Sequence, residues 1–487
     1  MAPSMFSRSA KISLVHCAEN QLLLTAKNAE DGNAPDKETQ IKLIDLCREA
    51  TPATCNLNPF LFNGHLQTGW TTIKETVEIP IYYKRKIFEQ EIPDLAGQFA
   101  VDFVVPPFEK TEDAEATDAA RKFTLPSGLP ARTAFFSQDE LGALPSDDSK
   151  PMLIALHGLT GGSHEVYLRA ALAPLVLDRD SGWEACVINA RGCAQTKIST
   201  SLLFNARATW DVRQLVKWLR KTFPNRPLFG IGFSLGANIL VNYLGEEGEN
   251  CLLNGAVICA NPWNLDVTSV ALHRTWIGAE VYSTHMAASL VRLFEQYVTL
   301  HTSCPTRDDS VCIANLKYER HVDELTSHPR LKPDDARKAK YIYEFDRAIQ
   351  CPLWGYPTEG AYYRDASSTD SLLSIRIPFL AINAEDDPIS AKEAIPYNEF
   401  QQTPYGVLLT TSWGGHLGWF ELGGARWFTK PAANFLDLLA QKIDLTVPPV
   451  LQKDTRGLHG ESLDKPSQGP SGFYPVRRKL VFKSESD

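Results

Sequence analysis

The sequence predicts an α/β fold in which a mostly parallel, eight-stranded sheet is flanked by helices and carries a helical cap insertion. From residue 151 onward, short apolar runs alternate with amphipathic stretches, which is the pattern of parallel strands joined by crossover helices. After the fourth run the alternation stops. A long polar and aromatic stretch, residues 264–371, then separates that run from the next strand, and we expect it to form the cap.

The individual elements follow from local patterns. The parallel strands are predicted at four continuous apolar runs, because strands that are buried on both faces lack polar alternation. These runs are residues 152–156, 185–188, 228–231 and 255–258. Later strands are predicted at 377–382 and 406–410, extended segments before the parallel part at 72–79 and 99–105, and helices at 211–220, 235–244, 285–298 and 432–445.

The chain is predicted to hold one catalytic domain between two peripheral segments. Residues 1–40 are expected to form an N-terminal extension and residues 41–447 the domain with its cap. Residues 448–487 are rich in Pro, Gly, Ser and charge, so we expect a disordered tail.

Composition excludes several classes of function. A net charge of −9 does not favour nucleic acid, whose phosphates require a basic surface. No apolar run reaches the length of about 18 residues that a membrane-spanning helix needs. The ten cysteines show no C-x-x-C spacing, so no zinc site is expected, and several lie in apolar runs as reduced thiols would in the cytoplasm.

The pentapeptide 232–236, GFSLG, is a G-x-S-x-G motif. It lies between a predicted buried strand and a predicted helix, where flanking glycines allow a tight turn that exposes the hydroxyl of Ser234. A glycine-rich packing turn is the alternative interpretation. The context favours Ser234 as the nucleophile of a serine hydrolase with the α/β-hydrolase fold.

A nucleophilic serine needs a histidine base, and a carboxylate must hold that histidine in one tautomer. In the α/β-hydrolase fold the order along the chain is Ser, acid, His. Only His416 and His459 of the eleven histidines follow the next predicted strand, and His459 lies in the predicted tail. We therefore predict His416 as the base.

The acid is predicted in residues 383–388, NAEDDP, directly after that strand. Glu385, Asp386 and Asp387 compete for the role, and spacing alone does not separate the two aspartates.

Two backbone N–H groups are expected to bind the oxyanion, one from Leu235 and one from the loop 157–162, HGLTGG. Leu159 is the favoured donor in that loop and Thr160 the next. His157 precedes Ser234, so a structural role is expected for it. Arg191 is expected to pair with a carboxylate. Neither a cofactor nor a metal is needed.

Six motifs together resemble the fourth family of the AB hydrolase superfamily, over residues 41–445. They are residues 58–68 (NPFLFNGHLQT), 157–162, 232–238 (GFSLGAN), 362–368 (YYRDASS), 383–388 and 414–418 (GGHLG). This family includes fungal medium-chain fatty acid ethyl ester synthase/esterases and mammalian monoacylglycerol and phospholipid hydrolases. The resemblance implies that the acid is the aspartate before the proline, Asp387, and assigns no triad role to His65.

The resemblance also implies acyl-ester chemistry in lipid metabolism. Ser234 would be acylated by a medium-chain acyl ester or acyl-CoA, and water or an alcohol would take the acyl group. Glu421 stands where some acyltransferase-like relatives have Asp, which is a departure from the transferase pattern. Peripheral contact with lipid droplets or the mitochondrial outer membrane is compatible with this function. The aromatic cap residues Trp276, Phe294, Tyr297 and Trp354 are candidates for an acyl pocket or for the core.

Two alternatives remain at this stage. One is a tailoring hydrolase or O-acyltransferase of a fungal secondary-metabolite pathway. The other is a catalytically silent relative that acts as a binding protein.

Overall fold

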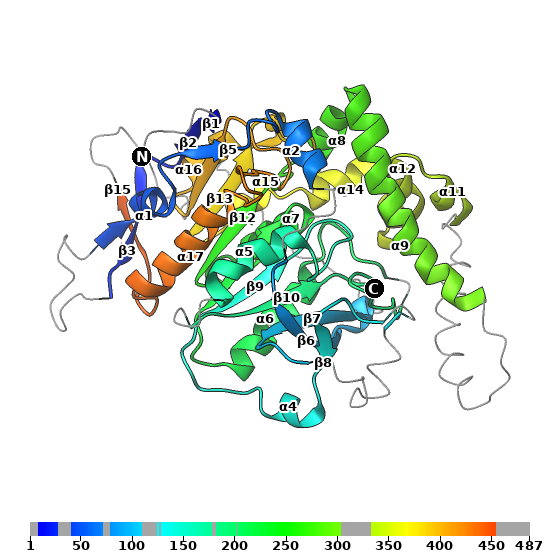
Figure 1. Cartoon of the computed structure of the whole chain (residues 1–487), viewed down its shortest axis with the longest axis horizontal. Coiled ribbons are helices and arrows are strands. Elements are labelled where there is room, and N and C mark those ends of the chain that lie inside the picture. The colour runs from blue at the N-terminus through cyan, green and yellow to red at the C-terminus, as the bar shows by residue number, and fades with distance from the viewer. Residues whose placement is uncertain are drawn as a thin grey trace, which may run out of the picture.

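The computed structural model describes residues 8–27, 40–71, 78–109, 124–125, 128–177, 182–200, 202–302 and 333–453. A ten-stranded sheet forms its centre, in the order β2-β14-β13-β12-β11-β9-β10-β7-β6-β8 (Figure 1). The six strands from β14 to β10 are mutually parallel. Strands β7 and β6 extend this part antiparallel, and β2 pairs antiparallel with β14.

The bounds of the strands agree closely with the predicted runs. The parallel strands are β9 Met152–Leu156, β10 Glu184–Asn189, β11 Leu228–Phe233, β12 Gly255–Cys259, β13 Phe379–Ala384 and β14 Gly406–Thr411. The others are β2 Ile12–Val15, β6 Tyr82–Glu89, β7 Gln98–Val105 and β8 Thr133–Phe135. The predicted segment 72–79 lies mostly outside the described residues, and its described end is not a strand.

The predicted number of eight strands is too low for this ten-stranded sheet. No predicted segment corresponds to β6, to β2, which is four residues long, or to β8, which is three residues long. Strands β2 and β8 lie at the two edges of the sheet and are short, so neither forms a long apolar run.

Helices cover both faces of the sheet. On one face, α6 Thr209–Thr222 and α7 Leu235–Glu247 pack together on the strands. On the other face lie α1 Leu43–Ala50, α5 Val166–Val176 and α17 Thr429–Lys442. The predicted apolar stripe of α6 is buried, and it includes Val212, Leu215, Val216 and Leu219.

The described part of the N-terminal extension belongs to the folded domain. Besides β2, it forms β1 Arg8–Ala10, which pairs with β5 Cys55–Leu57, and β3 Asn20–Thr25. Strand β3 pairs with β4 Gln40–Lys42 and with β15 Val450–Lys453. The start of the predicted tail is thus a strand, and residues 454–487 lie outside the described residues.

The described part of the insertion at 264–371 is helical, as predicted, and most of it lies at the upper right of Figure 1. Its elements are α8 Leu265–His273, the π-helical η5 Gly278–Ser283, α9 Thr284–Thr302, α11 Pro333–Lys338, α12 Ile342–Phe345, the π-helical η6 Asp346–Gln350, α13 Cys351–Trp354, α14 Glu359–Ala366 and α15 Thr369–Leu372. None of the described helices is both long and apolar enough to cross a bilayer.

The cap contains a buried carboxyl group, Asp346, which accepts a hydrogen bond from the Tyr363 hydroxyl at 2.6 Å. Burial raises the pKa of Asp346 to about 7, because the charged form loses its hydration, and the nearby Glu359 adds to the rise. The folded protein therefore binds a proton that the unfolded chain releases at lower pH.

We expect Asp346→Asn to remove the loss of folding stability that the buried carboxyl group causes as pH rises. As pH rises from the ordinary pKa of 3.8 toward about 7, the wild-type protein loses free energy of unfolding, and above that range the loss is constant. At pH 8 the variant should be more stable by about 2–4 kcal/mol, with the difference shrinking toward pH 4. Urea unfolding at several pH values measures this. Asp334→Asn, at an exposed cap carboxylate, is the control, and an Asp346 variant with the wild-type pH profile would contradict the assignment.

Candidate active site

Ser234 occupies a strained turn between β11 and α7. Its φ is +53°, a backbone conformation that residues with a side chain rarely adopt. The flanking glycines make the turn possible. A Cβ on Gly232 would lie 2.7 Å from the Gly236 carbonyl oxygen, and a Cβ on Gly236 would lie 2.4 Å from the His157 carbonyl oxygen. The G-x-S-x-G pattern is therefore dictated by close backbone contact.

His416 lies in the loop after β14 and reaches the serine. Its Nε2 is 2.8 Å from Ser234 Oγ, and its Nδ1 is 2.8 Å from Asp387 Oδ2. With the proton on Nδ1, the ring donates to the aspartate and accepts from the serine hydroxyl, as a general base must. The His416 backbone N–H donates to Thr68 Oγ1 at 2.8 Å, which fixes the loop.

The two adjacent aspartates have different partners. Asp387 is buried, and its other oxygen, Oδ1, accepts the N–H groups of Ile389 and Ser390, both at 2.8 Å. Asp386 Oδ1 instead accepts the N–H groups of Gly414 and Gly415, at 2.8 and 3.0 Å. Asp387 thus orients the imidazole, whereas Asp386 holds the backbone just before it. Burial raises the pKa of Asp386 above its ordinary value.

The loop after β9 runs against the nucleophile. A Cβ on Gly158 would lie 3.4 Å from Ser234 Cβ, so the backbone that leads to Leu159 lies beside the serine. Leu235 is the first residue of α7, and the first N–H groups of a helix have no partner within it. Both predicted oxyanion donors therefore lie next to Ser234 in the chain or in space. The Gly158 N–H donates to the Tyr167 hydroxyl at 2.8 Å, which shapes this loop.

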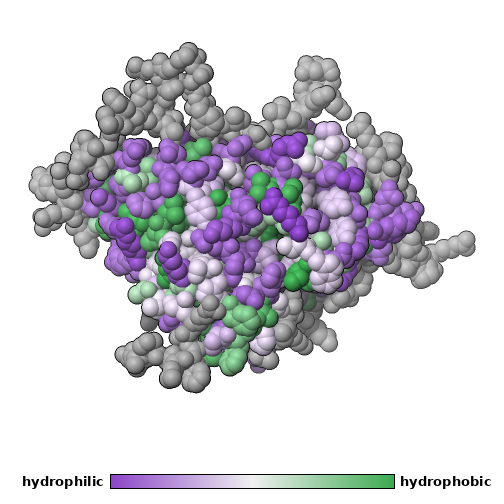
Figure 2. All heavy atoms as spheres, turned by 90° about the horizontal axis from the view of Figure 1, so that it is seen from above, coloured by the Kyte–Doolittle hydropathy of each residue, from purple (hydrophilic) through white to green (hydrophobic). Residues whose placement is uncertain are grey.

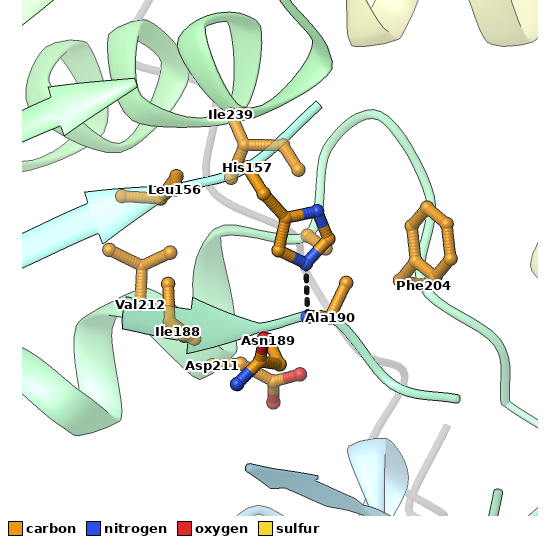
Figure 3. A pocket seen from close by; sticks show the side chains of 11 residues that line it. Leu156, His157, Ile188, Asn189, Ala190, Phe204, Asp211, Val212 and Ile239 are labelled. Atoms are coloured by element: carbon orange, nitrogen blue, oxygen red, sulfur yellow. Dashed lines mark hydrogen bonds between the residues drawn. The ribbon is translucent and has the colours of Figure 1, made fainter. Parts of the chain in front are cut away.

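His157 has a structural role. Its Nε2 accepts the Ala190 N–H at 3.0 Å (Figure 3), so Nδ1 carries the proton and donates to the Gly158 carbonyl at 2.7 Å. Burial lowers its pKa to about 4, which keeps the ring neutral. A cavity of about 30 Å³ lies beside this ring, lined mainly by apolar side chains such as Ile188 and Phe204.

Sequence patterns missed a buried ionic network beneath the same loop. Asp102 on β7 receives two hydrogen bonds from Arg85, at 2.6 and 2.8 Å. It also accepts from Ser163 Oγ at 2.5 Å and Asn189 Nδ2 at 2.9 Å. Because Asn189 Oδ1 accepts the Ser163 N–H, the network fixes the end of the HGLTGG loop to β10 and β7. The separation of these residues along the chain left no local signal.

The predicted pairing of Arg191 with a carboxylate is confirmed. Its Nε and Nη2 each lie 2.9 Å from an oxygen of Asp211, and both side chains are buried. Glu421, the position at which transferase-like relatives have Asp, is bound by Lys430 Nζ at 2.6 Å and makes no hydrogen bond with the triad in the described structure.

The described cap aromatics have different surroundings. Phe294 is 1% exposed and belongs to the core, which is one of its two expected roles, whereas Trp276 is 73% exposed and so does not belong to the core. Trp354 packs on Trp210, with ring centroids 4.9 Å apart. The side chain of Tyr297 lies outside the described residues. Aromatic composition alone did not distinguish a lining residue from a core or surface residue.

A serine on a strand-to-helix turn, hydrogen-bonded to a histidine that an aspartate holds, is the arrangement of a serine hydrolase of the lipase and esterase type. Residues 151–419 match the family model described as alpha/beta hydrolase fold. The chain belongs to this family.

The chain is also similar to several named proteins of this family. The chain is 35% identical over 439 residues to "Monoacylglycerol lipase" of Saccharomyces cerevisiae, covering 88% of this chain and 91% of the relative. It is 30% identical to "Medium-chain fatty acid ethyl ester synthase/esterase 2" of the same yeast, covering 82% of this chain and 90% of the relative. It is also 31% identical to "Phospholipase ABHD3" of Mus musculus, covering 56% of this chain and 59% of the relative.

The two aspartates can be separated by mutation. We expect Asp387→Asn to lower kcat for a soluble ester by about 10⁴-fold, because the amide no longer holds the proton on His416 Nδ1. Asp386→Asn keeps an acceptor oxygen for the two glycine N–H groups, so its kcat should fall by no more than about tenfold. Steady-state kinetics with a p-nitrophenyl ester measure both variants. A larger loss in Asp386→Asn than in Asp387→Asn would refute this division of roles.

Proposed function

We propose that this protein is a serine esterase that forms an acyl-enzyme at Ser234 from medium-chain acyl esters or acyl-CoA. The observation that carries the proposal is the continuous chain of hydrogen bonds from Ser234 Oγ through His416 to Asp387. It gives the hydroxyl a base at hydrogen-bonding distance, and it gives that base a fixed tautomer.

The chemistry follows in two halves. Ser234 Oγ attacks the acyl carbonyl carbon while His416 Nε2 takes the hydroxyl proton, and the N–H groups of Leu159 and Leu235 bind the oxyanion. The tetrahedral intermediate collapses, and the leaving alcohol or thiol takes the proton from His416. Water or an alcohol then gives its proton to His416 and attacks the acyl-enzyme, which releases a free acid or a new ester and restores the serine.

The substrate class rests on two kinds of support. The yeast relatives that match most of the chain are named for monoacylglycerol and for medium-chain ethyl esters. The strained, half-buried serine turn and the flanking N–H donors suit acyl transfer from an ester carbonyl. Whether water or an alcohol takes the acyl group depends on which of them reaches the acyl-enzyme, since the same base activates both.

Covalent labelling tests the nucleophile. We expect the wild-type protein to react with a fluorophosphonate probe, and Ser234→Ala to lose all labelling, because the phosphorus is attacked only by the activated hydroxyl. Gel fluorescence of the labelled protein is the measurement. Ser146→Ala serves as the control, since Ser146 Oγ donates to Asp148 Oδ2 at 2.7 Å and has no contact with the triad in the described structure. A wild-type protein that never labels would refute the enzyme proposal.

Product analysis separates the two acceptors. The protein is incubated with a medium-chain acyl-CoA, or with the matching ethyl ester, with and without ethanol, and products are identified by mass spectrometry. We expect free acid from both substrates, and ethyl ester from acyl-CoA when ethanol is present. Free acid alone would restrict the activity to hydrolysis, and no product in a protein that labels at Ser234 would refute the substrate class.

A further inference from the structure

Two segments near the loops that carry His416 and Asp387 expose large apolar side chains to solvent. The first is the loop before α2 (Gly64–Trp70) together with that helix, and the second runs from the end of α8 through η5. Phe60 is 76% exposed and Trp276 is 73% exposed, although side chains of this kind are normally covered. We call this set the apolar rim, and it consists of Phe60, Phe62, Leu66, Trp70, Trp276, Ile277 and Val281.

The rim is built onto the catalytic loops. Helix α2 turns its other face to the histidine loop, where Thr68 Oγ1 accepts the His416 N–H at 2.8 Å. Gly64 packs so tightly against the acid loop that an added Cβ would lie 1.9 Å from the Asp386 carbonyl oxygen. The exposed face of α2 is therefore held in a fixed position relative to the triad.

One contact joins the two segments of the rim. His65 Nδ1 lies 3.0 Å from the Tyr282 hydroxyl, and the two rings stack with centroids 5.7 Å apart. Helix α2 and the segment that follows α8 therefore meet, near the top of Figure 1. Seen from above, that face shows several separate groups of hydrophobic side chains among polar ones (Figure 2). The two segments of the rim are thus joined to each other, and through α2 to the histidine loop.

The rim lacks free charge. Residues 51–73 contain no Asp, Glu, Lys or Arg, although the chain carries 107 such residues, 49 basic and 58 acidic. In the second segment, the charged side chains of Asp266, Arg274 and Glu280 each lie within ion-pair distance of an opposite charge. An uncharged apolar surface with two tryptophans suits the interface of an uncharged lipid layer, where indole rings lie at headgroup level.

The net charge of the chain also favours an uncharged lipid surface over an anionic one. A net charge of −9 repels an anionic surface, and the rim offers no cluster of Lys or Arg to overcome that repulsion. A second copy of the chain would have to bring two such faces together and close the approach to both serines. A lipid layer instead covers the apolar side chains and supplies acyl esters at the same place.

We propose that the apolar rim docks the protein on a zwitterionic phospholipid surface, with Ser234 facing the lipid. The docking proposal rests on the proposed esterase function. Docking would let an acyl ester pass from the lipid layer to Ser234 without crossing water. The rim side chains insert among the headgroups, and the triad keeps its geometry.

Vesicle flotation with the full chain tests the surface separately from the chemistry. Vesicles of phosphatidylcholine, with or without phosphatidylserine, are mixed with wild-type protein, with Phe60→Ser/Trp276→Ser, and with the control Leu177→Ser/Leu252→Ser. The control residues are also exposed and apolar but lie at the opposite, amino-terminal end of the parallel strands. Hydrolysis of p-nitrophenyl acetate, a soluble ester, is measured in parallel on all three proteins.

We expect wild type and control to float with phosphatidylcholine, and phosphatidylserine to weaken the binding. The rim variant should bind at least about tenfold more weakly for each side chain removed. All three should hydrolyse the soluble ester at rates within about twofold, because surface substitutions leave the triad intact.

Each other outcome overturns the docking surface. In three such outcomes, wild type does not float, the rim variant floats like wild type, or binding requires phosphatidylserine. In a fourth, wild type forms a dimer without lipid and the rim substitutions dissociate it. If wild type floats through the rim yet hydrolyses no ester, the docking surface stands and the esterase proposal fails. If wild type hydrolyses the soluble ester but never floats, the esterase proposal stands and the docking surface fails.

Discussion

The close contact between the serine turn and the loop after β9 sets the geometry of the site. Gly236 lies so near the His157 carbonyl that no side chain fits between them, and Gly232 is confined in the same way by α7. This contact forces Ser234 into its positive φ and brings it beside Gly158. The hydroxyl, the base and the expected oxyanion donors meet because backbone approaches backbone at this one point.

Buried charges hold the surrounding loops in place. Arg85 with Asp102 and Arg191 with Asp211 are nearly inaccessible to solvent, and each pair is completed by further hydrogen bonds. Buried ion pairs are expensive to desolvate, so their contribution to net stability is small, but their geometry is strict. Both pairs lie under loops at the carboxyl ends of strands. The rigidity of the site therefore depends on contacts that no local motif encodes.

The sequence was informative where topology restricts the choice. Strands β9 to β12 are buried except for Glu184 at the start of β10, so their apolar runs were clear. The G-x-S-x-G motif identified Ser234, and the fixed order of the fold then singled out His416. The sequence was uninformative where the role of a residue depends on the direction in which its side chain points. Asp386 and Asp387 are adjacent and identical, and only the turn that points one at His416 and the other at Gly414 and Gly415 distinguishes them. Strand β2 escaped prediction because four half-buried residues carry too weak a pattern.

Strand β2 has a further consequence for the molecule. Among the described residues it is the last strand on its side of the sheet, and it occupies the hydrogen-bonding edge of β14, whose end leads into the histidine loop. A chain that began after residue 16 would leave that edge open, and an open edge is a template for pairing with another molecule. The N-terminal segment thus covers the edge of the strand that leads to His416 and prevents that edge from pairing with another molecule. This sets a limit on how far the protein can be shortened from its N-terminus.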